Sequence, residues 1–320
     1  MRFLVVGAGA IGGYFGGRLL EAGRDVTFLL RPARAAQIAV GGLAIRSALG
    51  DADLPAPPWL LAEDLAAPFD VVLLSCKAQD LAGAVAAFAP AVGPGTAILP
   101  LLNGMRHLDA LDARFGPGRV LGGECLISTT LDEAGRVIHL NEAHSLLFGE
   151  RDGASSARTD AIAEAFAGAQ FDGRRSDAIL QEMWEKWVFI AAAAGITCLL
   201  RATVGDIVAA GASEPATALL AECGAIAAAQ GFAPRDRALD RFRRMLAEPG
   251  STLAASMLRD IERGAATEGE HILGDLLRRA APGQDAPMLR LAQAHLRAYE
   301  ARRTRERGAA EQAGSEQGAA

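Results

Sequence analysis

Short apolar runs alternate with helical patterns along the first third of the chain. Four of these runs are rich in Val and Leu, and they predict strands at residues 2–6, 26–30, 70–75 and 96–100. The periodicity between them predicts helices at residues 10–22, 33–40 and 79–89. Continuous apolar strands that alternate with helices are typical of a parallel sheet with both faces covered. We therefore predict an α/β fold with a doubly wound sheet in this part of the chain.

The pattern changes twice farther along the chain. Residues 119–128 and 136–148 predict two antiparallel strands, joined by a turn at residues 132–135. From about Ser176 the apolar positions follow a helical period, which predicts an all-helical second domain.

The ends of the last helices are predicted from local signals. Thr267-Glu268-Gly269-Glu270 matches a capping box, and Pro287 is expected to open a final helix that runs toward Arg302. The remaining residues are rich in Gly, Ala, Glu and Gln, which predicts disorder. The expected organisation is therefore a Rossmann-type domain at 1–173, a helical domain at 174–302 and a disordered tail at 303–320.

The composition of the 320 residues fits an ordinary folded core, because 51% of them are hydrophobic. The net charge of −6 argues against nucleic acid as the main partner. No membrane span is expected, since no apolar stretch of about 18 residues lacks charge. The apolar run at residues 3–6 is too short for a signal peptide, so we expect a cytoplasmic protein. Four scattered cysteines and five scattered histidines predict neither a disulfide framework nor a metal site.

A glycine-rich turn follows the first predicted strand. It consists of Gly7, Ala8, Gly9, Ala10, Ile11 and Gly12. A strand before it, a helix after it and a second strand near Leu30 are the context of a Rossmann dinucleotide-binding turn. Gly7 permits the tight turn, Gly9 leaves room for a pyrophosphate, and Gly12 lets the helix lie close to the strand. We expect the N–H groups at the start of the helix to bind the phosphates.

The end of the second predicted strand indicates which dinucleotide binds. An NAD site usually has Asp or Glu there, which accepts a hydrogen bond from the ribose 2′-hydroxyl. Here the strand is followed by Arg31, with Arg34 nearby, and Asp25 lies at its other end. A guanidinium suits a 2′-phosphate in charge and geometry, so we predict NADP(H); a solvated surface arginine is the alternative.

Two further polar residues follow predicted parallel strands, where open α/β sheets bind ligands. Lys77 follows the strand at 70–75 and is placed to reach the cofactor phosphates. Asn103 follows the strand at 96–100 and offers an amide donor and an acceptor. A lysine at a helix start and an Asn-Gly turn explain the same residues equally well.

Lys186 lies in a predicted helix over 177–194, at the border of its apolar face. A lysine there can be a catalytic acid, but it can also form a surface ion pair with Glu182 one turn earlier, which its position alone favours. Glu268 is similar, since an acid in a first helical turn complements the helix dipole without any further role.

In their order along the chain, these motifs resemble those of the ketopantoate reductase family, the 2-dehydropantoate 2-reductases. The resemblance covers about residues 1–302. It is carried by Gly7–Gly12, Arg31, Cys76-Lys77-Ala78, Leu102-Asn103-Gly104-Met105, Trp184-Glu185-Lys186, Ser256-Met257-Leu258-Arg259-Asp260-Ile261 and Thr267-Glu268.

The resemblance implies NADPH-dependent reduction of a 2-oxo acid to a 2-hydroxy acid, with ketopantoate, a precursor of pantothenate and coenzyme A, as the default substrate. It also implies a Rossmann domain joined to a helical domain, with the site in the cleft between them. By the same resemblance, Lys186 donates the proton to the carbonyl oxygen and Asn103 contacts cofactor and substrate. Ser256 binds the carboxylate end of the substrate, and Glu268 helps to hold the cofactor or orients Lys186.

The chain departs from the family pattern on the helix of Lys186. Members usually carry asparagines four and eight residues after the lysine, which contact the hydroxyl-bearing part of the substrate. Ile190 and Ala194 occupy these positions here, and apolar side chains cannot replace the hydrogen bonds of an amide. A less polar 2-oxo acid or ketone is therefore the alternative substrate.

A third interpretation is a non-catalytic protein that senses NADP(H), although such a protein would need neither Lys186 nor Glu268. The alanine-rich helical domain also leaves a homodimer open, since such helices can pack closely.

Overall fold

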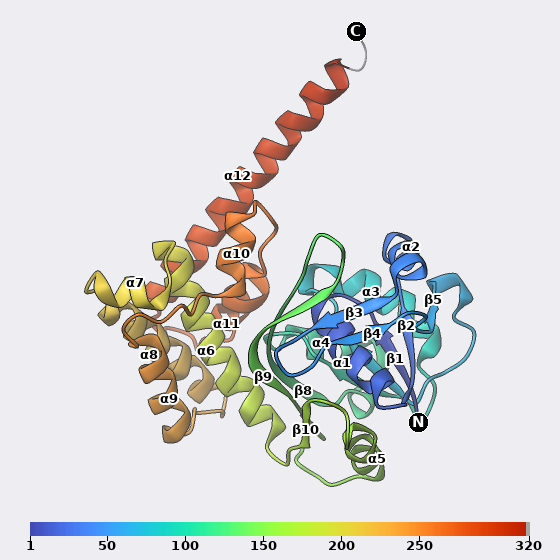
Figure 1. Cartoon of the computed structure of the whole chain (residues 1–320). Coiled ribbons are helices and arrows are strands. Elements are labelled where there is room, and N and C mark those ends of the chain that lie inside the picture. Colours follow the sequence, from blue (N-terminus) through green and yellow to red (C-terminus); the bar gives the residue numbers. More distant parts are fainter. Residues whose placement is uncertain (318–320) are drawn as a thin grey trace. The chain divides into compact units, whose positions relative to one another are not determined.

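The computed structural model describes residues 1–317, with side chains described as far as Gly308, and the chain forms two compact units. The first is Met1–Met183 and the second begins at Trp184 (Figure 1). The division falls inside helix α6 (Ile179–Leu200), rather than at the predicted boundary at residue 173. The reason is packing, because a Cβ at Gly122 would lie 2.7 Å from the Ile179 side chain. The first turn of α6 thus belongs to the first unit.

The first unit is built around a five-stranded parallel sheet with the order β5-β2-β1-β6-β7. Its strands are β1 (Arg2–Val6), β2 (Asp25–Leu29), β5 (Trp59–Leu60), β6 (Val71–Leu74) and β7 (Ala97–Pro100). Its helices are α1 (Ala10–Glu21), α2 (Pro32–Gly41), α3 (Leu81–Phe88) and α4 (Arg106–Phe115). Strand β1 is central, so the turn that follows it lies where the strand order reverses, the usual ligand position in such sheets. The predicted α/β fold is confirmed.

A second sheet packs on the other side of helix α1. Its order is β10-β9-β3-β4, with β8 paired to β9. Its strands are β3 (Leu43–Arg46), β4 (Ala52–Leu54), β8 (Gly122–Leu131), β9 (Val137–Gly149) and β10 (Asp172–Arg175), and helix α5 is Ala157–Phe166. A Cβ at Gly13 would lie 2.8 Å from Val137 of this sheet, and one at Gly16 2.7 Å from Phe28 of the first. Because glycine has no side chain, Gly13 and Gly16 on two faces of α1 let this helix lie close to both sheets.

The second unit is helical. It contains the remainder of α6, then α7 (Val204–Ala209), α8 (Ser213–Ala229), α9 (Asp236–Leu246), α10 (Ser256–Glu262), a π-helical turn at Glu270–Gly274, α11 (Asp275–Arg278) and α12 (Pro287–Gln317). Helix α6 is long and apolar enough to cross a membrane, but 72% of its most apolar window is buried inside the protein. This burial is typical of a core helix, around which the others pack (Figure 1).

Two local predictions for this unit are wrong. Helix α12 continues past Arg302 to Gln317, where disorder was expected, because Ala, Arg, Glu and Gln are good helix formers. The last predicted tail residues, 318–320, lie outside the described part of the chain. Thr267 caps no helix: its backbone N–H and hydroxyl both donate to Glu300 Oε1, at 2.6 and 2.8 Å. Glu270 pairs with Arg297 and Arg278 instead.

Candidate functional site

The glycine-rich turn has the geometry that its sequence predicts. Gly7 has a φ of +90°, in the region that disfavours side chains, and its N–H donates to Leu29 O at 3.0 Å. A Cβ at Gly12 would collide with the Gly7 carbonyl oxygen and with Ser75 Oγ. A Cβ at Gly9 would meet nothing within 4 Å, so open space lies beside the turn.

The N-terminus of α1 suits an anion. In the described structure no side chain caps this helix, and its first turn carries no acidic residue. Four N–H groups at a helix start lack partners within the helix, and the helix dipole adds partial positive charge there. The turn and helix together can therefore bind a pyrophosphate.

Two residues outside the glycine motif, Ser75 and Arg34, fix this turn. Ser75, after β6, donates from Oγ to Val6 O at 3.0 Å. Arg34 of α2 donates from Nε to Ala8 O at 2.9 Å and from Nη2 to Gly135 O at 2.8 Å. Burial lowers the pKa of Arg34. No local sequence pattern pairs Arg34 with Gly135, about a hundred residues later. Its closeness to Arg31 in the sequence is the only signal that points to Arg34 as a candidate site residue.

Arg31 lies at the N-cap of α2, directly after β2, and its side chain is 71% exposed. It is not a lone solvated arginine, because its Nη2 lies 2.8 Å from Asp80 Oδ1. Asp80 comes from a 3₁₀ turn (Ala78–Asp80) that follows β6. The hydrogen bond and charge of Asp80 raise the pKa of Arg31.

Lys77 follows strand β6, and Asn103 follows strand β7. Lys77 is exposed at the start of the 3₁₀ turn, and Asn103 is half-buried in the loop after β7. Gly104, at a φ of +73°, turns the chain beside Asn103. Parallel strands end at the same edge of a sheet, so the glycine-rich turn, Arg31, Lys77 and Asn103 all lie along one edge of the first unit.

Lys186, in the second unit, is half-buried on α6 between two anchored neighbours. The buried carboxylate of Glu185 accepts hydrogen bonds from Arg235 Nε at 2.7 Å and Nη2 at 2.6 Å. The buried ring of Trp187 donates from Nε1 to Ile272 O at 3.0 Å. These contacts on either side hold the backbone of Lys186 in one place.

The segments of Glu268 and Ser256 are both bonded to α6. Ile272, whose carbonyl oxygen Trp187 holds, donates its N–H to Glu268 O at 2.9 Å. The N–H of Ala255, directly before Ser256, donates to the buried Thr197 Oγ1 at 3.4 Å. Glu268 is half-buried, and Ser256 is exposed at the start of α10. Hydrogen bonds thus connect the segments that carry Glu268 and Ser256 to helix α6, which carries Lys186.

Ile190 and Ala194 follow Lys186 by one and two helical turns, so the three share a face of α6. Ile190 is half-buried and Ala194 is 3% exposed. Thr197 lies one turn farther, but its hydroxyl donates to Ala193 O at 2.7 Å. The face beside Lys186 is therefore apolar at both positions where the family usually carries an amide.

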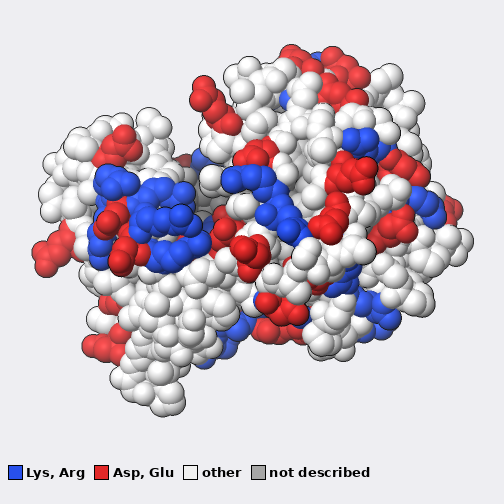
Figure 2. Space-filling view, turned by 90° about the horizontal axis from the view of Figure 1, so that it is seen from below, with Lys and Arg blue, Asp and Glu red and all other residues white. Residues whose placement is uncertain are grey.

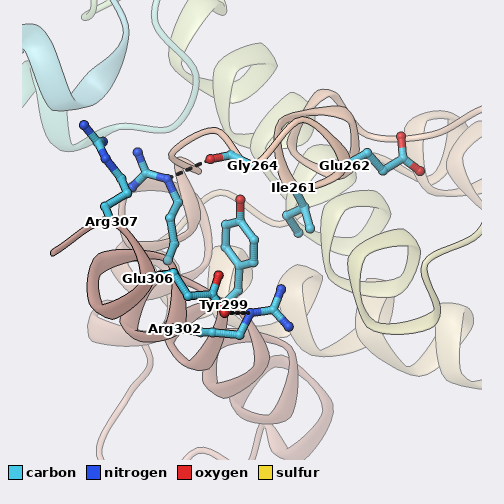
Figure 3. Close-up of a pocket in the computed structure, with 8 residues that line it drawn as sticks. Ile261, Glu262, Gly264, Tyr299, Arg302, Glu306 and Arg307 are labelled. Carbon is cyan, nitrogen blue, oxygen red and sulfur yellow. Dashed lines mark hydrogen bonds and ion pairs between the residues drawn. The ribbon is translucent and has the colours of Figure 1, made fainter. Parts of the chain in front are cut away.

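A surface depression of about 420 Å³ lies elsewhere in the second unit, between α10 and α12 (Figure 3). Its lining residues are Ile261, Glu262, Gly264, Tyr299, Arg302, Arg303, Glu306 and Arg307. Several of its polar groups already bond within the protein: Tyr299 donates to Ala265 O at 2.8 Å and Arg303 to Gly264 O at 3.0 Å. It contains none of the predicted site residues.

The surface charge is mixed. On the face in Figure 2, acidic and basic side chains are interspersed, apart from one dense group of basic ones. With a net charge of −6, this face does not change the expectation of a small-molecule partner.

Sequence profiles of one family match almost the whole chain. The family Ketopantoate reductase PanE/ApbA matches residues 3–153, and its C-terminal part, Ketopantoate reductase PanE/ApbA C terminal, matches residues 178–300. An uncharacterized oxidoreductase of Bacillus subtilis, YkpB, is 40% identical over 305 residues, which cover 94% of this chain and 99% of the relative.

Solved structures share the fold. The 2-dehydropantoate 2-reductase of Geobacter metallireducens superposes with a TM-score of 0.84 at 32% identity, covering 93% of this chain and 99% of that one. A D-mandelate dehydrogenase in a ternary structure with NADH and anilino(oxo)acetate also has a TM-score of 0.84, covering 95% of this chain and 100% of that one. At 20% identity, this second likeness shows the fold alone.

Proposed function

Because the chain belongs to the ketopantoate reductase family, we propose that it reduces a 2-oxo acid to a 2-hydroxy acid with NADPH, and that 2-dehydropantoate is its first candidate substrate. It is an oxidoreductase of this family, whose members use nicotinamide dinucleotides and typically act on small oxo acids. The observation that carries the proposal is Lys186, a half-buried lysine whose two neighbours are anchored by the Glu185–Arg235 ion pair and the Trp187 hydrogen bond.

The residues of the first unit fit the dinucleotide. The uncapped start of α1 and the open space beside Gly9 suit its pyrophosphate, and Arg31 suits a 2′-phosphate. Lys77 adds positive charge at the same sheet edge, and Asn103 provides an amide there for cofactor or substrate. When bound, the reduced nicotinamide supplies the hydride.

The residues of the second unit fit the acid–base part of the reaction. Hydride arriving at a ketone carbon leaves negative charge on the oxygen, and the Lys186 ammonium can stabilise this charge and donate the proton. A rigid backbone matters here, because small errors in placement reduce the rate steeply. In this proposal the Ser256 hydroxyl binds the substrate carboxylate, and Glu268 helps to hold the cofactor or orients Lys186.

Ile190 and Ala194 favour a second candidate substrate, a 2-oxo acid with an apolar side chain. Both lie on the face of α6 that carries Lys186. A hydroxyl-bearing substrate that met this face would lose hydrogen bonds to water without gaining new ones. An apolar side chain would gain from the same contact.

Turnover of NADPH with a panel of 2-oxo acids of graded polarity tests the proposal. Highest kcat/KM with 2-dehydropantoate supports the first candidate, and highest kcat/KM with apolar 2-oxo acids supports the second. Binding of NADPH without turnover of any of them would support a sensor and overturn the reductase.

Lys186→Ala tests the proton donor. Loss of general acid catalysis is expected to lower kcat by about 10²–10⁴-fold, while NADPH still binds. Arg237→Ala, which removes an exposed positive charge from α9 of the same unit, is the control and should keep full activity. A kcat for Lys186→Ala within twofold of the parent enzyme would rule out the assigned role.

A further inference from the structure

Opposite charges meet at the place where the ribose of the cofactor is expected. Arg31 follows β2, and Asp80 is the last residue of the 3₁₀ turn after β6. Their Nη2 and Oδ1 atoms are 2.8 Å apart, and the Asp80 side chain is 38% exposed. Strands β2 and β6 lie on either side of β1, and the segments that follow these two strands bring the side chains together.

These two charges favour different dinucleotides. A phosphomonoester carries about −1.5 to −2 charges at neutral pH, so a 2′-phosphate is attracted by Arg31 and repelled by Asp80. A carboxylate at this place accepts a hydrogen bond from the unsubstituted 2′-hydroxyl of NADH, the role of the acid in NAD-binding sheets. Here the acid comes from the 3₁₀ turn after β6, rather than from the end of β2, where NAD sites usually carry it.

The ion pair also competes directly with the phosphate. Arg31 must turn its guanidinium from Asp80, or share it, to bind a 2′-phosphate. We infer that Asp80 is a coenzyme-selectivity residue, which weakens NADPH binding and supports NADH binding, so that the enzyme accepts both dinucleotides. This inference rests on the proposed function, because it requires a dinucleotide on the glycine-rich turn with its ribose at Arg31.

Exposed ion pairs contribute little to stability, so Asp80 can be replaced without loss of the fold. Asp80→Asn keeps the size of the side chain and removes its charge. Direct titration of the protein with NADPH and with NADH, followed by ligand fluorescence, measures both dissociation constants without any substrate. Removal of one charge near the phosphate should lower the dissociation constant for NADPH by about tenfold. The dissociation constant for NADH should rise, because a neutral amide accepts a hydrogen bond from the 2′-hydroxyl less strongly than a carboxylate does.

A second variant separates repulsion from positioning. In Arg31→Ala the Asp80 carboxylate faces the phosphate with no guanidinium beside it. Adding Asp80→Asn to that variant should therefore recover part of the lost NADPH affinity. If Asp80 only oriented Arg31, its replacement would have no effect once Arg31 is gone.

Asp25→Asn is the matched control, because it removes the same charge from the first residue of β2, at the opposite end of the strand. Its affinities for both dinucleotides should equal those of the parent protein. Weaker NADPH binding by Asp80→Asn, or equal changes for both dinucleotides, would overturn the inference and leave the proposed function intact. A parent protein that binds neither dinucleotide would overturn the proposed function, and the inference with it.

Discussion

Two arginines close together on α2 have different tasks. Arg31 is mostly exposed and forms an ion pair with Asp80. Arg34 is half-buried and donates a hydrogen bond to Ala8 O of the glycine-rich turn. The sequence distinguishes the first, because its place at the end of β2 is defined by the fold. It cannot distinguish the second, whose other partner, Gly135, is brought there only by the second sheet.

Single replacements should separate these tasks. Arg31→Ala is expected to raise the KM for NADPH by about tenfold or more and to change that for NADH little, since only the phosphate loses a charged partner. Arg34→Ala should raise the KM for NADPH and the KM for NADH by similar factors, because the glycine-rich turn loses its hydrogen bond at Ala8 O. Steady-state kinetics with both cofactors makes the comparison. Equal effects of Arg31→Ala on NADPH and NADH would contradict its role at the 2′-phosphate.

At the scale of elements, the longer strands of the parallel sheet, β1, β2, β6 and β7, were predictable because each apolar run is buried on both faces, and helices α1, α2 and α3 between them were predicted as well. The two-residue strand β5 and helix α4 were not predicted. The short strands β3, β4 and β10 were not predicted either, since three or four residues carry too little periodicity. The π-helical turn was also missed. Thr267 appeared to cap a helix, but it bonds to Glu300 on α12, a partner that no local pattern reveals.

The hydrogen bond from Trp187 to the π-helical turn can be tested by Trp187→Phe. The ring is largely kept, but the buried Ile272 carbonyl oxygen loses its donor, which should cost about 1–3 kcal/mol in the free energy of unfolding. We also expect kcat to fall, because Ile272 also donates its N–H to the carbonyl oxygen of Glu268, so the position of Glu268 depends on Ile272. Denaturant unfolding and turnover measure the two effects. Trp184→Phe is the control, because no hydrogen bond from the Trp184 indole is found among the described residues. An equal loss of kcat in Trp184→Phe would assign the effect to weaker packing of the helices and not to the Trp187 hydrogen bond.

At the scale of the whole molecule, the two-unit organisation was predictable, but the boundary was not. A change of periodicity marks where helices begin, whereas the division depends on which residues pack together, and the first turn of α6 packs on β8. Arg31, Lys77, Asn103 and Lys186 are likewise found on or directly after the expected elements, whereas Glu268 precedes the π-helical turn and does not lie in the first turn of a helix. Their assignment to cofactor or substrate came from the family resemblance, and it stays a prediction.

Stability of the fold should depend on pH through a partly buried polar cluster in the first unit, formed by Tyr14, His139 and His144. His144 Nδ1 lies 2.8 Å from the Tyr14 hydroxyl, and the rings of His139 and His144 stack at 5.9 Å. Burial lowers the pKa of His144, and the nearby charges of His139 and Arg18 lower it further. The unfolded chain therefore binds this proton more readily than the folded one, so stability is fully present above about pH 6.5 and is lost as pH falls below it.

Chemical denaturation over a pH series measures this loss, which for one group is at most about 1.4 kcal/mol per pH unit. His144→Asn keeps an acceptor for Tyr14 but cannot take up the proton, so its stability should fall less steeply on acidification. A variant as pH-sensitive as the parent would assign the effect to other groups.

The two bonds of Arg34 have a practical consequence. One guanidinium joins the backbone of the glycine-rich turn to that of Gly135, at the tip of the β8–β9 hairpin. We therefore expect a change in the turn to reach this hairpin tip, where Glu133 is exposed. A fluorescent label at position 133, attached to a cysteine that replaces Glu133, would thus signal the arrival of a dinucleotide from outside the glycine-rich turn.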